Sequence, residues 1–322
     1  MAIKGSGSSL SFSEIEAEFG ANGSRSLGSY RLTQNVGSLS NLPLDSGIPT
    51  SGTIKFSDFY SKRLNMVVDC FSGGVESRII AKNDKWNNNQ VTVIGGFRSK
   101  KEGGSKIIIN VNKKFCSNKD TTTRCALRTG SWDGSSTVQV DVGSSGRILG
   151  SGGDGGRGQN GIDGSAQAGF TGTSGLGIEV NNCTVNIASG GIIRAGFGGG
   201  GGGGGGRQRD KGEDRRASGG GGGGGAGCPP GNGGPRGTTG ALGSDGSAGT
   251  ETTGGGGGGG GNNANQAFGG SGGSGGQAQG GPGGGQGGGG ANGAAIRRTS
   301  GFNVTINNSG TVQGSTNATG TS

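Results

Sequence analysis

The chain has 322 residues, of which 87 are glycine and only 26% are hydrophobic, and its net charge is +9 with no histidine. Average proteins contain roughly 7% glycine, so this composition excludes one conventional core along the whole chain. Most of the glycine follows Gly143, which confines a conventional core to the first half. Histidine, the commonest general base, is missing, no P-loop motif occurs and the carboxylates are scattered. The sequence therefore predicts no enzyme and no cofactor.

Basic residues exceed acidic ones between Asn65 and Gly150. This balance fits an anionic partner such as nucleic acid, an anionic glycan or lipopolysaccharide, and it also fits a solvated, solubilising surface. The N-terminus lacks the apolar segment of a signal peptide, and no stretch of 18 apolar residues occurs. We therefore expect neither secretion by a signal peptide nor a membrane span.

The cysteines are scattered, odd in number and never in a C-x-x-C motif. This pattern argues against a disulfide framework and against a zinc site, so we expect no metal and buried free thiols in a protein made in a reducing cytoplasm. The five are Cys70, Cys116, Cys125, Cys183 and Cys228.

Residues 1–62 form a small polar module. Residues 11–20 are predicted to be a short helix, with Ser11 or Ser13 in an S-x-x-E capping box and Gly20 at its end. Residues 52–56 are predicted to form a strand, and residues 57–60 a turn or short helix. Because the module has few apolar residues, its independent core is poor, and we expect it to need a partner surface.

Residues 63–150 have the pattern of a β-domain. Ile107, Ile109 and Val111 alternate with polar residues, as in a half-buried strand. Clusters of Asn, Lys, Gly and Ser separate the expected strands and predict loops. We expect a compact antiparallel domain with strands at residues 66–68, 77–82, 90–94, 105–112 and 136–142.

An internal repeat follows. Residues 140–150, 185–195 and 304–314 align without gaps as two short apolar strands joined by a turn that ends in glycine. Such a unit is either a β-hairpin or one rung of a β-solenoid. The first two copies lead directly into glycine-rich sequence, so we expect them to set where each glycine segment starts.

The glycine-rich sequence has two features that an ordinary flexible linker lacks. Uninterrupted runs of similar length occupy residues 198–206, 219–225 and 254–261, and elsewhere glycine recurs every third residue, at positions 152–164 and 231–249. A period of three is that of the polyproline II helix, whose backbone groups all point outward and need partners when buried. Packed polyglycine II helices would satisfy them, with pure runs at the centre and Gly-x-y triplets at the edge. A collagen triple helix is a weaker alternative because only 6 prolines are present.

Strand repeats followed by glycine runs with variable polar inserts resemble the glycine-rich tail-fibre tip adhesins of T-even-type phages, over residues 138–322. This resemblance implies a polyglycine II sandwich whose distal loops recognise the host surface. Residues 48–60 are similar to the openings of marine myovirus structural proteins, which implies a module that docks onto other virion proteins. The resemblance thus implies an adhesin in the virion tail, made in the host cytoplasm.

Two polar inserts are the candidate receptor-binding sites. Mixed charges and amides suit sugar hydroxyls and phosphates, which arginine can bind bidentately. A solvated loop that joins two helices is the simpler alternative, and Phe197 and Phe268 fit better as hydrophobic caps of the bundle than as ligand-stacking residues. The candidate residues are Arg207, Arg209, Lys211, Arg215, Arg216, Asn262, Asn263, Asn265, Gln266 and Phe268.

The sequence therefore predicts a mostly β and irregular protein with an attachment module (1–62), an antiparallel β-domain (63–150), a polyglycine II bundle with β-hairpin repeats (151–302) and a C-terminal strand repeat (303–322). Its expected partners are other tail or fibre proteins and a host glycan or outer-membrane protein, without nucleic acid or membrane insertion. A purely structural tail or baseplate component stays open as an alternative. The charged inserts argue against ice binding, and the isolated Arg157 and Arg236 argue against an RGG-type RNA binder.

Overall fold

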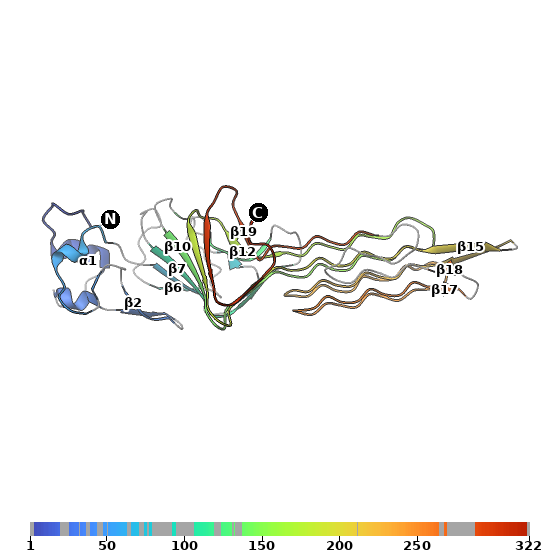
Figure 1. Cartoon of the computed structure of the whole chain (residues 1–322), viewed down its shortest axis with the longest axis horizontal. Helices are drawn as coiled ribbons and strands as arrows, with labels where there is room; N and C mark the ends of the chain where they lie inside the picture. The colour runs from blue at the N-terminus through green and yellow to red at the C-terminus, as the bar shows by residue number, and fades with distance from the viewer. Residues whose placement is uncertain are drawn as a thin grey trace.

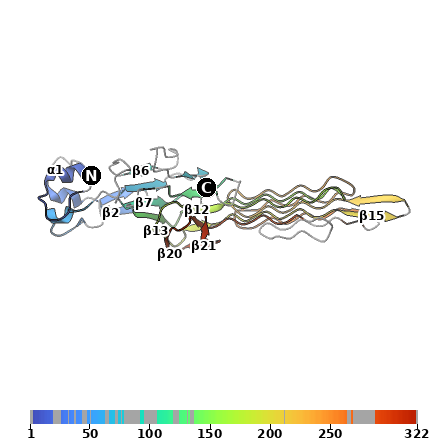
Figure 2. The ribbon, with the colours of Figure 1, turned by 90° about the horizontal axis from the view of Figure 1, so that it is seen from above.

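The molecule is elongated, with a helical N-terminal module at one end, a β-solenoid in the middle and glycine-rich segments that extend away on the other side (Figure 1). The view from above shows the same three parts in one line (Figure 2). This computed structural model describes residues 3–19, 26–31, 33–36, 39–43, 48–49, 51–62, 66–70, 74–75, 77–78, 92–94, 106–118, 124–130, 132, 137–210, 212–263, 267–268 and 287–320.

The N-terminal module has its own small core. The capping box predicted at Ser11 is confirmed, because the Ser11 N–H donates to Glu14 Oε2 at 2.8 Å and the Glu14 N–H donates back to Ser11 Oγ at 3.4 Å. The apolar face of the helix contributes Ile15 to a cluster with Ile3, Tyr30, Ile48 and Phe59. The elements are α1 (Phe12–Phe19), η1 (Leu27–Arg31), η2 (Phe56–Phe59) and the hairpin β1 (Thr33–Val36) with β2 (Leu39–Pro43).

The strand predicted at residues 52–56 is wrong, whereas the short helix after it is confirmed. Residues 53–55 have no regular structure and Phe56 begins η2. Asp58 accepts a hydrogen bond from the Lys55 N–H at 2.7 Å, which favours the helical turn. Phe56 then packs edge-on against Phe12, with ring centroids 4.9 Å apart. This local cap and the packing of the aromatic rings outweigh the strand pattern.

The middle of the molecule is a β-solenoid of three sheets, in which successive rungs contribute one strand to each sheet. The first sheet contains β3 (Met66–Cys70), β7 (Lys106–Val111), β10 (Thr137–Val142), β13 (Cys183–Ile187) and β20 (Val304–Asn308). The second contains β4 (Gly74–Val75), β8 (Lys114–Cys116), β11 (Arg147–Leu149), β14 (Ile192–Arg194) and β21 (Thr311–Gln313). The third contains β5 (Ser77–Arg78), β9 (Cys125–Arg128), β12 (Ser174–Ile178), β19 (Ile296–Arg298) and β22 (Ala318–Thr319).

The expectation of an antiparallel β-domain is wrong, because the solenoid strands pair in parallel. In the described residues of the solenoid the antiparallel exception is β6 (Thr92–Ile94), which pairs with the edge of β3. The alternation that predicted a half-buried strand is real, since Ile107, Ile109 and Val111 are fully buried in the solenoid core. Alternation reports which face is buried and carries no information on strand direction.

The internal repeat is a set of successive solenoid rungs, which resolves the choice between hairpin and rung. Val140 lies beside Val185 and Ile148 beside Ile193, as the gapless alignment predicts. In the third copy the first strand is displaced by two residues, so that Ile306, rather than Val304, lies beside Val185. A shift of two keeps the same side chains facing the core.

The glycine-rich segments are excursions from the solenoid. The chain leaves after β11 at residues 150–173 and again after β14 at residues 195–295, and each time it returns to a strand of the third sheet. In Figure 1 these segments run side by side away from the solenoid. The described parts of the outward segments are residues 150–160, 195–205, 229–240 and 254–261, and those of the return segments are residues 166–173, 218–228, 241–250 and 287–295.

Backbone hydrogen bonds join neighbouring glycine segments at every third residue. The N–H groups of Gly219, Gly222 and Gly225 donate to one neighbouring segment, at carbonyls of Gln159, Gly156 and Gly153, over 2.8–2.9 Å. The residues in between donate in another direction, as Gly221 and Gly224 do to Ser244 and Ser247. Each segment therefore shares its hydrogen bonds among several neighbours, which is what a buried backbone without internal hydrogen bonds requires.

Several of the glycines that recur every third residue face a neighbouring backbone, whereas a Cβ added to Gly164 would meet nothing within 4 Å. A Cβ atom on Gly231 or Gly234 would lie 1.9 or 2.2 Å from a carbonyl oxygen of the adjacent segment. The expectation that pure runs lie at the centre holds for residues 219–225 and is wrong for residues 254–261. There Gly256 is exposed, and a Cβ added to it would meet nothing within 4 Å.

Two contacts anchor the glycine segments to the solenoid. Cys116 of β8 and Cys228, at the end of the return segment 218–228, form a disulfide with Cα atoms 5.1 Å apart. This disulfide contradicts the expectation that all the thiols are free. The two cysteines are 112 residues apart and belong to different parts of the fold, so the spacing of cysteines in the sequence did not indicate the bond. Cys70, Cys125 and Cys183 are buried thiols, as expected.

The second anchor is Glu251, in a turn of the glycine segments beside the solenoid. Its carboxylate accepts a hydrogen bond from Lys114 Nζ. It also forms ion pairs with Arg147 Nη1 at 3.3 Å and Arg194 Nη2 at 3.5 Å. These cations come from three successive rungs of the second sheet. Burial works to raise the pKa of Glu251, but the Lys114 hydrogen bond and the three positive charges together hold it below its ordinary value.

Candidate functional site

The insert at residues 207–218 forms a β-hairpin at the end of the glycine segments farthest from the solenoid (Figure 1). Strands β15 (Gly206–Asp210) and β16 (Glu213–Ala217) pair in antiparallel register, with Arg207 opposite Arg216. Gly212 stands in the turn with a φ of +86°, a conformation that favours glycine. The hairpin therefore extends the outward segment beyond the hydrogen-bonded glycine segments, here called the glycine lattice, and exposes its side chains at the tip.

Most of the charged side chains on this hairpin are paired with one another. Arg207 lies 2.6 Å from Asp214, Arg215 lies 2.6 Å from Glu213, and Arg216 lies 3.0 Å from Asp214. The Arg207 hydrogen bond is the main cause that holds the pKa of Asp214 below its ordinary value. Three of the predicted receptor-binding arginines thus have intramolecular partners.

Arg209 differs from these three arginines. Its side chain is exposed and lines a groove of about 440 Å³ together with Arg207, Gly212, Glu213 and Asp214. Among the described residues no carboxylate pairs with Arg209. Lys211 lies outside the described residues. Arg209 is therefore the described cation of this hairpin best placed to meet a ligand.

The second insert also lies at the distal end. Strands β17 (Asn262–Asn263) and β18 (Ala267–Phe268) pair with Asn262 opposite Phe268, and β18 lies beside β15 and β16. Asn262 is exposed. Asn265 and Gln266 lie outside the described residues. The structure thus brings the backbones of the two predicted inserts together at one tip.

Two further turns join this tip, and the sequence pattern revealed neither of them. The first covers residues 160–166, where Asp163 lies 3.0 Å from Arg216. The second covers residues 238–243, where Leu242 is 53% exposed, an unusual state for a large apolar side chain. Asn160 Oδ1 accepts a hydrogen bond from the Thr238 N–H at 2.8 Å and so links the two turns. Glycine recurs every third residue through both turns, so the sequence does not distinguish them from the glycine segments on either side. The available signal was Leu242, a large apolar residue among polar and small ones.

Phe197 lies at the opposite end of the glycine segments, next to the solenoid. Its N–H donates to Ala226 and its carbonyl accepts from Gly153, so its backbone takes part in the lattice. That the Phe197 side chain caps the bundle rather than stacking on a ligand stays a prediction.

The described residues hold no group of three or more His, Cys, Asp or Glu side chains suited to a metal ion. The one α-helix among them, α1, is too short to cross a membrane, and no described helix qualifies as a span.

Comparison with known protein families matches residues 76–317 to the family described as phage tail fibre adhesin Gp38. The matched range includes most of the solenoid, all of the glycine segments and both inserts. No curated protein and no solved structure matches the chain. Since the match covers well over half of the sequence, the chain belongs to the phage tail fibre adhesin Gp38 family.

Proposed function

We propose that this adhesin recognises a host-surface receptor through the distal tip formed by the two inserts and the turns at residues 160–166 and 238–243. The observation that carries the proposal is the meeting of these four loops at the end farthest from the solenoid. At this end of the molecule they present a groove of about 440 Å³, the exposed Arg209 and the exposed Leu242. A mixed polar and apolar surface of this kind is typical of a recognition site.

In this proposal the glycine segments form a polyglycine II sandwich that holds the tip rigidly away from the rest of the particle. Hydrogen bonds at every third residue in several directions support it. The close packing of Gly222 supports it too, because a Cβ on this residue would lie only 2.0 Å from the Gly200 carbonyl oxygen. A flexible linker has neither property.

The proposed receptor is a host glycan, including one that carries phosphate or carboxylate groups, or an outer-membrane protein. The ion pairs neutralise much of the charge on the hairpin, so the attraction of an anion rests on Arg209 and, by sequence, on Lys211. We further propose that residues 1–62 attach the protein to other tail or fibre proteins. A structural tail component without receptor binding is the competing function.

Adsorption of phage particles to host cells tests the proposal. Replacing residues 207–216 with a short Gly/Ser turn should abolish adsorption, and Arg209→Ala should slow it about tenfold, a loss of about 1.4 kcal/mol in binding. Lys113→Ala is the matched control, because Lys113 is an exposed cation on the solenoid, far from the tip. Particles that carry the Gly/Ser turn and adsorb at the normal rate would favour the structural component instead.

A further inference from the structure

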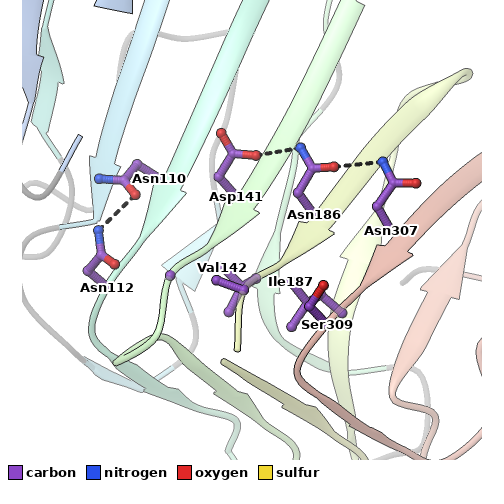
Figure 3. A pocket seen from close by; sticks show the side chains of 10 residues that line it. Asn110, Asn112, Asp141, Val142, Asn186, Ile187, Asn307 and Ser309 are labelled. Carbon is purple, nitrogen blue, oxygen red and sulfur yellow. Dashed lines mark hydrogen bonds between the residues drawn. The ribbon is translucent and has the colours of Figure 1, made fainter. Parts of the chain in front are cut away.

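Amide and carboxylate side chains form a column on the outer face of the first sheet (Figure 3). Asn110, Asp141, Asn186 and Asn307 occupy the same register position on β7, β10, β13 and β20. Their neighbours on each strand point into the core, as Val140 and Val185 do. The column therefore runs along the solenoid, one polar group per rung, about 4.8 Å apart.

The hydrogen bonds within the column have a fixed direction. Asn307 Nδ2 donates to Asn186 Oδ1 at 2.8 Å, and Asn186 Nδ2 donates to Asp141 Oδ1 at 2.7 Å. Gln139 Nε2 also donates to the Asp141 carboxylate, at 2.9 Å. The carboxylate thus orients the Asn186 amide and, through it, the Asn307 amide, in one line of hydrogen bonds (Figure 3).

The oriented amides retain hydrogen-bonding capacity. A side-chain amide has two N–H donors and an acceptor oxygen. Asn186 and Asn307 each use one donor in the column, and Asn307 Oδ1 has no partner among the described residues. Asn307 is exposed and Asn186 is half-buried. Donors and acceptors therefore lie side by side at the surface, an arrangement that matches hydroxyl groups, which both donate and accept.

A groove of about 370 Å³ lies over this column. Beside the polar groups it is bordered by Val142, Ile187 and Ala188 near the turn after each strand; the first two side chains are buried in the core, and Ala188 is exposed. Gly143 leaves the space that the Asn112 amide occupies, since a Cβ there would lie 1.8 Å from Asn112 Oδ1. The groove thus combines the polar column with the exposed methyl group of Ala188, and its volume suits a small ligand.

We propose that this groove binds a neutral saccharide, as a site separate from the distal tip. A sugar ring has hydroxyl groups at its edge, which fit the donors and acceptors of the column, and C–H groups on its face, which can rest on Ala188. The residues that line the groove include one carboxylate and no cation, so they select against anionic sugars. The rung spacing of about 4.8 Å is close to the length of one pyranose unit, so successive amides can contact successive units of a chain.

Binding of the purified full-length protein to immobilised neutral oligosaccharides of glucose, mannose and galactose tests this site. We expect the wild type to bind at least one of them, and Asn307→Ala and Asn186→Ala to weaken that binding tenfold or more. Asn307→Ala should leave the melting temperature unchanged, because the side chain is exposed. Thr305→Ala is the matched control, since Thr305 is exposed on the same strand but does not line the groove.

A variant with residues 207–216 replaced by a Gly/Ser turn should keep this binding, which separates the groove from the tip. Free oligosaccharide should compete with the immobilised form, and whole lipopolysaccharide with neutral side chains tests whether the host surface is the source. Absence of binding to every neutral oligosaccharide, or equal binding by wild type and Asn307→Ala, would overturn the proposal and leave the column as a stabilising ladder only.

Discussion

At the scale of single residues, the bundle depends on the absence of side chains. At Gly202 and Gly222 a Cβ would lie 2.0 Å from a carbonyl oxygen of another segment, closer than any real contact. The carbonyl cannot move away without losing hydrogen bonds of its own. Glycine is therefore required at these positions by packing rather than by backbone conformation. By the same criterion Gly256 is dispensable, because it faces open space.

We expect Gly222→Ala to destabilise the protein and Gly256→Ala to leave it unchanged or slightly more stable. The Gly222 N–H donates to Gly156 and its carbonyl accepts from Gly234. Separating these partners costs about 1–3 kcal/mol for each buried group left without a hydrogen bond. Alanine at Gly256 restricts the unfolded chain and should stabilise by up to about 1 kcal/mol. Calorimetric melting of the two full-length variants compares them directly, and equal melting temperatures would contradict the packing argument.

At the scale of elements, the turns next to the solenoid fix the glycine segments in place. Glu251 meets cations from three rungs, and one of them, Arg194, is 5% exposed. Burial holds the pKa of Arg194 below its ordinary value, against the raising effect of Glu251. The carboxylate therefore offsets like charges that would otherwise repel one another at the base of the bundle.

Glu251→Gln should lower stability by about 1–3 kcal/mol at neutral pH, between the values for exposed and buried ion pairs. Because the pKa of Glu251 is lowered in the folded state, its contribution is present above its ordinary pKa of 4.5 and is lost as the pH falls through the folded value. The difference in melting temperature between wild type and variant should therefore shrink below about pH 4.5. Glu213→Gln at the exposed tip is the control and should change little; a wild-type advantage that persists at about pH 2 would contradict the role of this carboxylate.

The sequence predicted the existence of several elements better than their pairing. Strands β3, β7 and β10 lie where the sequence predicted strands, and in β7 the apolar alternation arises because one face is buried. The parallel pairing depends on contacts between rungs, which a single strand does not encode. The internal repeat carried the missing information, since rungs that stack in register must resemble one another. Short strands such as β4 and β8 are too brief to show any period.

At the scale of the whole molecule, the solenoid and the glycine segments interleave along the chain. The glycine excursions start and end on solenoid strands, so rungs of the solenoid hold both ends of each excursion. The position of the first insert at the far end followed from run length and is what the structure shows. The ion pairs within it, and the approach of residues 160–166 and 238–243, depend on which segments are neighbours, and the sequence did not contain that in readable form.

The Cys116–Cys228 disulfide is expected to hold the solenoid and the bundle as one cooperative unit. Removing it with Cys116→Ser and Cys228→Ser should lower stability by up to about 4–5 kcal/mol, the chain-entropy value for a loop of this size. Calorimetry should then show an earlier transition for the bundle.

A reductant provides the matched control for this prediction. It should bring the wild type to the melting temperature of the double variant and leave the double variant unchanged, because Cys70, Cys125 and Cys183 are free thiols that a reductant does not alter. Cys116 and Cys228 are both partly exposed, so a reductant can reach the bond. Identical melting curves for the oxidised wild type and the double variant would show that Glu251 and the glycine lattice anchor the bundle without the disulfide.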